Sequence, residues 1–321
     1  MRVIDFHCDT LMKLYDLHRV NDHSQTLWEN KGQIDIRRLV KAGYGAQFFA
    51  CYIWWEDQPF LQSHYKDALG MADLFYQGLA GHEREAAFAG SYREYIKNRQ
   101  EGKVSCFLTV EEGGILEDRL ERLEELYQKG IRLITLTWNY ENCLGYPGCH
   151  PEMNKKGLKP FGIEALGRME ELGIIVDVSH LSDGGFEDVC RYSRRPFLAS
   201  HSNARSICRH NRNLTDEMIR QLAEKGGFTG INFGGDFLSE DGRSTTDAMI
   251  SHIRHIVKVG GREVVGIGTD FDGVEDELQI DGCQNMYKLA EAMEHAGFST
   301  GEIEDVCFRN AEKFMERYWG K

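Results

Sequence analysis

Proline is scarce in this sequence, at 5 of 321 residues, so neither a proline-rich linker nor a polyproline module is expected. Long hydrophobic runs are missing too, since no apolar stretch approaches the roughly 20 residues of a membrane-spanning helix. Basic residues are in deficit: 38 lysines and arginines against 51 acidic residues give a formal net charge of −13. Such a surface repels phosphate backbones and anionic headgroups, which argues against nucleic acid and membrane partners.

Cysteine pairing is not indicated, although the chain has nine cysteines. Their number is odd, their spacing is irregular and no Cys-x-x-Cys occurs, which favours reduced thiols over a disulfide framework or a sulfur-ligated zinc site. The first residues place Asp5, His7 and Asp9 where a signal peptide would need its apolar segment. We therefore expect a cytoplasmic protein.

The sequence does contain eight short apolar runs, each followed by a segment with helical periodicity. The runs are apolar continuously rather than alternately, as expected for parallel strands that are covered on both faces. Eight strand–helix units predict an α/β fold, a closed (β/α)8 barrel of the TIM type. The predicted strands are residues 3–7, 46–52, 104–109, 132–136, 174–178, 197–200, 227–233 and 264–268. No linker divides the chain, so we predict one domain over residues 1–321, with a helical insertion at about 56–101 and C-terminal surface helices at about 284–318.

Polar residues whose side chains can bind a cation follow several of the predicted strands. The carboxyl ends of barrel strands meet at one open mouth, where the loops between strands and helices converge. Taken singly, each residue has an ordinary explanation, such as a histidine capped by a turn aspartate or an acidic helix start. Four strand ends that bear these groups together favour a site for divalent cations. The residues concerned are His7 and Asp9, at least one of Glu111 and Glu112, His180, and His201.

The donor set has nitrogen and oxygen atoms but no thiolate, which suits Zn2+, Mn2+ or Co2+. Five protein ligands exceed the need of one open catalytic zinc site, and they suit two ions roughly 3.5–4 Å apart. Asp270, at the end of the eighth predicted strand, could take a proton from a water between the ions and return it to a leaving group.

These motifs resemble those of the renal or membrane dipeptidases, peptidase family M19 of the metal-dependent hydrolase superfamily. The resemblance covers nearly the whole chain. It rests on Asp-Phe-His-Cys-Asp-Thr at 5–10, Glu-Gly-Gly at 112–114, Asp-Val-Ser-His at 177–180, Ser-His-Ser-Asn-Ala-Arg at 200–205, Arg-Asn at 212–213 and Gly-Thr-Asp-Phe-Asp-Gly at 268–273.

The resemblance implies two zinc ions per subunit. It implies that His7 and Asp9 hold one ion, that His180 and His201 hold the other, and that Glu112 bridges them with Glu111 as a mere neighbour. It further implies that Arg212 pairs with the terminal carboxylate of a dipeptide and that Asp270 handles protons. Members of this family are often homodimers, so the sequence leaves open that this protein also forms a homodimer.

One position departs from the vertebrate pattern. Vertebrate members carry a histidine after the fourth strand, where this chain has Trp138 followed by Asn139. Tryptophan offers an indole N–H but no basic group. Two readings stay open: Trp138 shapes the substrate pocket while the metal stabilises the oxyanion, or Asn139 contributes a donor.

The expected function is hydrolysis of the peptide bond of a dipeptide by a hydroxide that bridges two ions, and the resemblance extends this to a C-terminal D-residue. An alternative keeps the dinuclear barrel but changes the substrate to a lactone, cyclic amide or phosphoester. A non-catalytic metal-binding barrel is less favoured, because all five ligand types and Asp270 are present.

Overall fold

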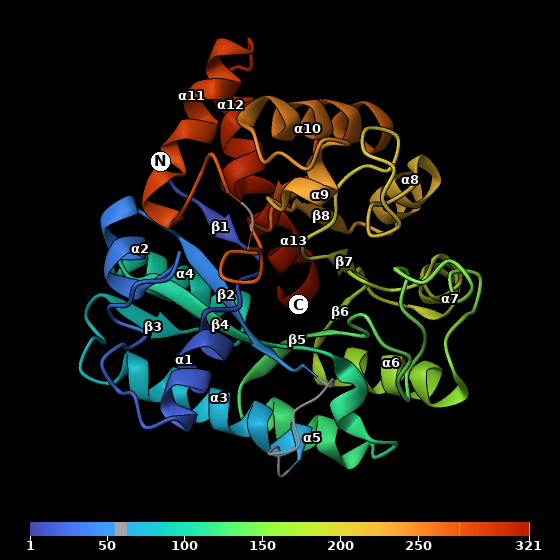
Figure 1. Ribbon diagram of the computed structural model, residues 1–321, viewed down its shortest axis with the longest axis horizontal. Helices are drawn as coiled ribbons and strands as arrows, with labels where there is room; N and C mark the ends of the chain where they lie inside the picture. The colour runs from blue at the N-terminus through green and yellow to red at the C-terminus, as the bar shows by residue number, and fades with distance from the viewer. Residues whose placement is uncertain (55–62, 276, 321) are drawn as a thin grey trace.

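Eight parallel strands form a closed ring in the computed structural model, which describes residues 1–54, 63–275 and 277–320 (Figure 1). Each strand pairs with the next around the ring. The second strand of the chain pairs with the fourth, and the first strand pairs with the last, so the ring is closed. The ring contains β1 (Ile4–Asp5), β2 (Ala46–Tyr52), β4 (Val104–Glu111), β5 (Ile131–Thr135), β6 (Ile175–Asp177), β7 (Leu198–Ala199), β8 (Phe228–Ile231) and β9 (Val265–Ile267). The (β/α)8 barrel and all eight predicted strands are confirmed.

A ninth strand, β3 (Ala86–Phe88), lies outside this ring and was not predicted. It pairs with the first residues of β4, Val104–Cys106, whereas β5 pairs with the later residues of β4, from Leu108 onward. Three residues give too short a pattern to recognise as a strand. The strand belongs to the expected insertion, whose residues 56–62 lie outside the described part and whose remainder holds α3 (His64–Leu79) and α4 (Tyr92–Gln100).

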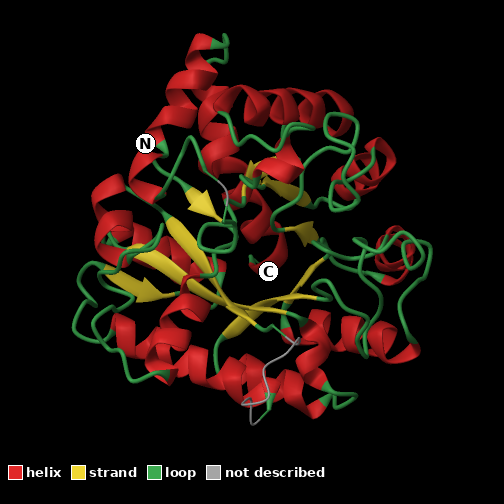
Figure 2. Cartoon of the chain, in the orientation of Figure 1, coloured by secondary structure: helices red, strands yellow, loops and turns green. Residues whose placement is uncertain are grey.

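Most of the helices surround the ring on its outer side (Figure 2). Several begin where the sequence supplies a capping oxygen; Thr215, for example, accepts a hydrogen bond from the Met218 N–H. Glycine ends others, as at Gly173, whose φ of 82° suits a residue without a side chain. The remaining helices are α1 (Thr10–Arg19), α2 (Ile36–Ala42), α5 (Glu121–Gln128), α6 (Pro160–Leu172), α7 (Asp183–Tyr192), α8 (Asp216–Glu224), α9 (Gly235–Leu238), α10 (Thr246–Gly260), α11 (Tyr287–His295), α12 (Thr300–Glu304) and α13 (Asn310–Trp319).

The last helix, α13, differs from the predicted surface helices. Figure 1 shows it at the centre of the ring of strands, and Phe314 and Tyr318 are buried. The Tyr318 hydroxyl donates to the carbonyl of Ile174, just before β6, and the Trp319 indole N–H donates to Gly173. Because these contacts precede a strand, α13 covers the amino end of the barrel and leaves the carboxyl end for chemistry.

Among the described residues, no helix is both long and apolar enough to cross a membrane.

Candidate metal centre

The carboxylate of Glu111 lies at the carboxyl end of the barrel, with His7 on one side and His180 and His201 on the other. Its Oε2 is 3.0 Å from His7 Nε2, and its Oε1 is 2.9 Å from His180 Nε2. His201 Nε2 is 2.9 Å from His180 Nε2, and Asp9 Oδ2 is 3.4 Å from His7 Nε2. All these side chains are buried. The barrel thus brings together the ends of β1, β4, β6 and β7.

The hydrogen bonds of His180 and His201 fix which ring nitrogen carries the proton. His180 Nδ1 is 2.9 Å from Asn139 Oδ1, an acceptor, so Nδ1 holds the hydrogen. His201 Nδ1 is 2.7 Å from Ser200 Oγ, whose own hydrogen goes to Asp177 Oδ2 at 2.6 Å. Both Nε2 atoms therefore present lone pairs to each other and to Glu111, with no hydrogen between them. A cation resolves this clustering of acceptors, and the donor set fits Zn2+.

Burial dominates the electrostatics of the cluster. It lowers the pKa of His180 and of His201 well below the usual 6.5, which keeps their imidazoles neutral. Burial also raises the pKa of Glu111 to about 8 and raises that of Asp270. For His7, burial lowers the pKa, but the carboxylates of Glu111 and Asp9 outweigh it and raise the pKa overall. Buried carboxylates of this density are costly unless a cation compensates them.

The described residues contain three groups that could hold a metal ion, and within each group the potential ligand atoms lie within 4.8 Å of one another. One is Glu111 with His180 and His201, and another is His7 with Asp9 and Glu111. The third is His7 with His201 and Asp270. Because Glu111 belongs to the first two, it is the carboxylate placed to join them.

This arrangement reverses our expectation for the two adjacent glutamates. Glu112 does not face the histidines; its carboxylate accepts from the N–H groups of Gly114 and Trp138, each at 2.8 Å, and from Asn142 Nδ2. Glu111 is the last residue of β4, and the chain turns at Glu112, where φ is 86°. The carboxylate that lies between the histidines is therefore that of Glu111, one residue earlier than the family resemblance implied.

Asp270 and Arg212 lie at the same mouth. Asp270 Oδ1 is 3.7 Å from His7 Nε2, while its Oδ2 accepts from Asn232 Nδ2 at 2.9 Å. Arg212 is buried, and its Nε has no hydrogen-bond partner. Its other nitrogens make only long bonds of 3.4 Å, to Ser202 Oγ and to the carbonyl of His201. A buried guanidinium with unused donors suits an anionic ligand.

Trp138 and Asn139 both lie next to His180. The Trp138 ring is 5.1 Å from the ring of Tyr52 and 6.1 Å from that of His180, measured between centroids. The Asn139 side-chain oxygen is engaged by His180 and not free to meet a substrate. Trp138 thus forms part of an aromatic wall, whereas Asn139 contacts a proposed metal ligand.

Sequence reasoning assigned no role to Asn232, which follows β8 and holds Asp270. Its position directly after a barrel strand was the available signal, but an asparagine there is equally common in turns. No separate role was predicted for Gly273 within its motif, yet a side chain at this position would collide with both Asp9 and Asp270.

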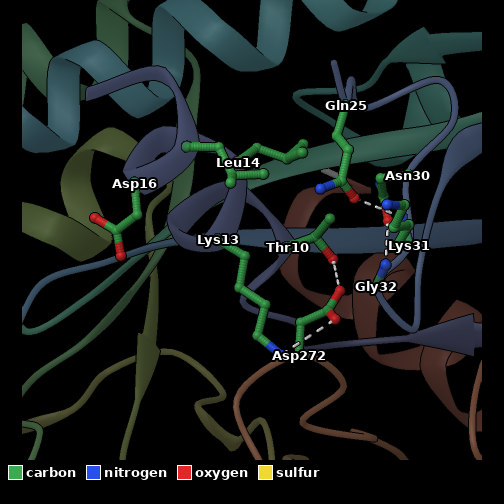
Figure 3. A pocket seen from close by; sticks show the side chains of 10 residues that line it. Thr10, Lys13, Leu14, Asp16, Gln25, Asn30, Lys31, Gly32 and Asp272 are labelled. Atoms are coloured by element: carbon green, nitrogen blue, oxygen red, sulfur yellow. Dashed lines mark hydrogen bonds and ion pairs between the residues drawn. The ribbon is translucent and has the colours of Figure 1, made fainter. Parts of the chain in front are cut away.

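A cavity of about 460 Å3 lies next to α1 (Figure 3). Asp272 lines it, and its Oδ2 accepts from Thr10 Oγ1 at 2.6 Å while Oδ1 accepts from the Gln33 N–H at 2.8 Å. Lys13 Nζ lies 3.6 Å from the same carboxylate. Asp272 therefore ties the turn after β9 to the start of α1 and supports Asp9, which precedes Thr10.

Comparison with known proteins identifies the family. The profile of the membrane dipeptidases, peptidase family M19, matches residues 1–318. This chain belongs to peptidase family M19. An uncharacterized dipeptidase of Schizosaccharomyces pombe is 32% identical to it over 306 residues, which span 89% of this chain and 71% of the relative.

Two solved structures share the fold of this chain over nearly its whole length. A metallopeptidase from Rhodobacter sphaeroides, crystallised with a phosphinate mimic of the dipeptide L-Ala-D-Ala, is 26% identical, with a TM-score of 0.90 and 99% of each chain covered. The dipeptidase AC, a metallopeptidase of family M19, is 27% identical, with a TM-score of 0.91 and coverage of 100% of this chain and 99% of the other. The predicted family and fold are thus confirmed.

Proposed function

We propose that this protein is a dinuclear zinc dipeptidase, with Glu111 as the carboxylate shared by the two ions. The observation that carries the proposal is the placement of the two Glu111 oxygens, one toward His7 and one toward His180. His7 and Asp9 would hold one ion, and His180 and His201 the other. Mn2+ or Co2+ would suit the same donors.

When bound, two such ions polarise the scissile carbonyl and bring the pKa of a water molecule toward neutrality. The chain's own residues supply the rest of the chemistry. Asp270 takes the proton of the attacking water at Oδ1, since Oδ2 is held by Asn232, and passes it to the departing amine. Burial raises the pKa of Asp270, which favours its role as a proton acceptor.

Arg212 binds the C-terminal carboxylate of the substrate through its unused donors. A planar guanidinium grips both oxygens, which fixes the distance from the free carboxylate to the scissile bond and so selects dipeptides. The rings of Trp138 and Tyr52, whose centroids are 5.1 Å apart, would line one side of the substrate pocket. The Rhodobacter relative bound to an L-Ala-D-Ala mimic supports acceptance of a C-terminal D-residue here. The unpaired Arg212 Nε favours a substrate with an anionic group, such as a dipeptide, over a neutral lactone or cyclic amide.

The test combines a substrate assay with a matched pair of variants. The protein loaded with Zn2+ should release amino acids from L-Leu-L-Ala and L-Ala-D-Ala. At saturating Zn2+, Glu111→Gln should lose at least one of two bound ions and more than 10³-fold in kcat/KM, whereas Glu112→Gln, which removes no proposed ligand, should still bind both ions. Equal metal loss in both variants, or no release of amino acids by the unaltered protein, would reject the proposal.

We also propose that the protein works in the cytoplasm. All nine cysteines are unpaired, which suits a reducing compartment.

A further inference from the structure

Glu112 is a buried acid that faces away from the proposed metal ligands, and its contacts join two loops. It accepts the N–H of Gly114, in the turn after β4, and the N–H of Trp138, in the loop after β5. Asn142 of the second loop donates a third bond from its side chain. Burial raises the pKa of Glu112 to about 7, while these three donors favour its ionised form.

The segment that Glu112 holds carries Asn139, whose side-chain oxygen meets His180. The backbone on both sides of this side chain is fixed. The preceding N–H, that of Trp138, bonds to Glu112, and the carbonyl of Asn139 itself lies 3.1 Å from His150 Nε2. Asn139 Oδ1 is thereby presented at 2.9 Å to His180 Nδ1.

We infer that Asn139 is a positioning residue that sets the orientation and tautomer of His180, and that Glu112 anchors the segment carrying it. The inference rests on the proposed metal centre. An acceptor at Nδ1 keeps the hydrogen on that nitrogen and turns the Nε2 lone pair toward Glu111 and His201. Asn139 touches no reacting atom in this arrangement and so acts only through the histidine.

The two neighbouring histidines use different acceptors. His201 has the hydroxyl of Ser200, backed by the Asp177 carboxylate, while His180 has a neutral amide. A neutral acceptor adds no charge to a mouth that already contains Asp9, Glu111 and Asp270. The substitution Asn139→Asp keeps an oxygen in the same place, and Asn139→Leu removes it with little change in size.

Binding of Co2+ to the metal-free full-length chain tests the inference without any substrate. Affinity is measured by competition with a chelator, and ligand geometry by the visible absorption of the bound ion. Asn139→Leu should weaken one of two sites by 10- to 100-fold and alter its spectrum, whereas Asn139→Asp should stay within about threefold of the unaltered protein. Asn285→Leu, which changes an exposed amide bonded to Asp281, serves as the control and should leave both sites unchanged.

Glu112→Gln should weaken the same site, and its effect should disappear in the Asn139→Leu background, because the two residues act in series. Circular dichroism and thermal unfolding establish that each variant folds, and Asn139→Ala replaces Asn139→Leu if the latter does not. Unchanged Co2+ affinity in both the leucine and alanine variants would overturn the inference, as would an aspartate variant as weak as the leucine variant. Absence of dipeptide turnover alongside an Asn139-dependent Co2+ site would reject only the proposed function. A chain that binds no Co2+ would reject both.

Discussion

Gly273 follows β9 at the point where two carboxylates of the proposed centre approach the backbone. A Cβ at this position would lie 2.1 Å from Asp9 Oδ2 and 2.5 Å from Asp270 Oδ1. Ordinary contact begins at 3.4 Å, so an alanine would be too close to the two oxygens by about 1.3 Å and about 0.9 Å. The φ of Gly273 is not in the left-handed region, so this crowding, and not backbone strain, is the cost of a side chain.

Gly273→Ala should therefore impair catalysis much more than folding. The atoms in conflict are the ends of two side chains, which can retreat by about 1 Å while the backbone stays in place. A displacement of 1 Å in a positioned group can reduce a rate by about 100-fold, equivalent to about 2.7 kcal/mol of transition-state stabilisation. Asp9 is also a proposed ligand, so the affinity for one ion should fall as well.

The measurement is kcat/KM for a dipeptide at saturating Zn2+, together with the metal content and the midpoint of thermal unfolding. Gly301→Ala is the matched control, since no atom lies within 4 Å of the added Cβ and the residue stands in α12. A Gly273→Ala enzyme within threefold of the unaltered protein, with both ions bound, would refute the arrangement of Asp9 and Asp270 described above.

Three further predictions concern Arg212, the bound metal and an ion pair between α8 and α10. Arg212→Ala should reduce kcat/KM for a dipeptide by about 100-fold, mainly through KM, yet change little for the corresponding dipeptide amide; an equal loss for both substrates would contradict carboxylate binding. Removal of metal by a chelator should abolish turnover and lower the thermal midpoint, both restored by Zn2+, because cations that bind only the folded chain stabilise it. The hydrogen bond from His255 lowers the pKa of Asp216 below its usual 3.8, so its contribution to stability should be present above that pH and be lost as the pH falls through the folded-state pKa. Asp216→Asn should remove this acid-dependent part, and parallel pH profiles of unfolding for variant and parent would contradict it.

Much of the site was predictable because a barrel gathers its strand ends at one mouth. His7, His180 and His201 follow different strands, and continuous apolar runs marked those strands clearly. Knowing the strand ends was therefore enough to bring the side chains together. The same logic could not find Asn232, whose role depends on which way its amide turns within the mouth.

The choice between Glu111 and Glu112 could not be made from the sequence, because a shift of one residue in a strand points a side chain the opposite way. The strand reaches Glu111, in register with Thr135 of β5, and the chain then turns at Glu112. The two glycines indicated only that at least one of the glutamates faces the mouth, and it was the family resemblance that implied Glu112. Only the point at which β4 ends decides the matter.

Three residues at the strand ends have a left-handed backbone conformation, which lowers the stability of the fold. Glu112, His180 and Asp270 have φ values of 86°, 66° and 61°. Each such residue costs about 1–3 kcal/mol relative to a relaxed conformation, and glycine would adopt these angles more readily. The chain nevertheless has a side chain with a proposed role at all three: Glu112 as an anchor for the loop after β5, His180 as a metal ligand and Asp270 as a proton carrier. Because the surrounding barrel holds the turns in place, strain at the mouth is compensated by the packed strands below it, and the site can be rigid without glycine at these three positions.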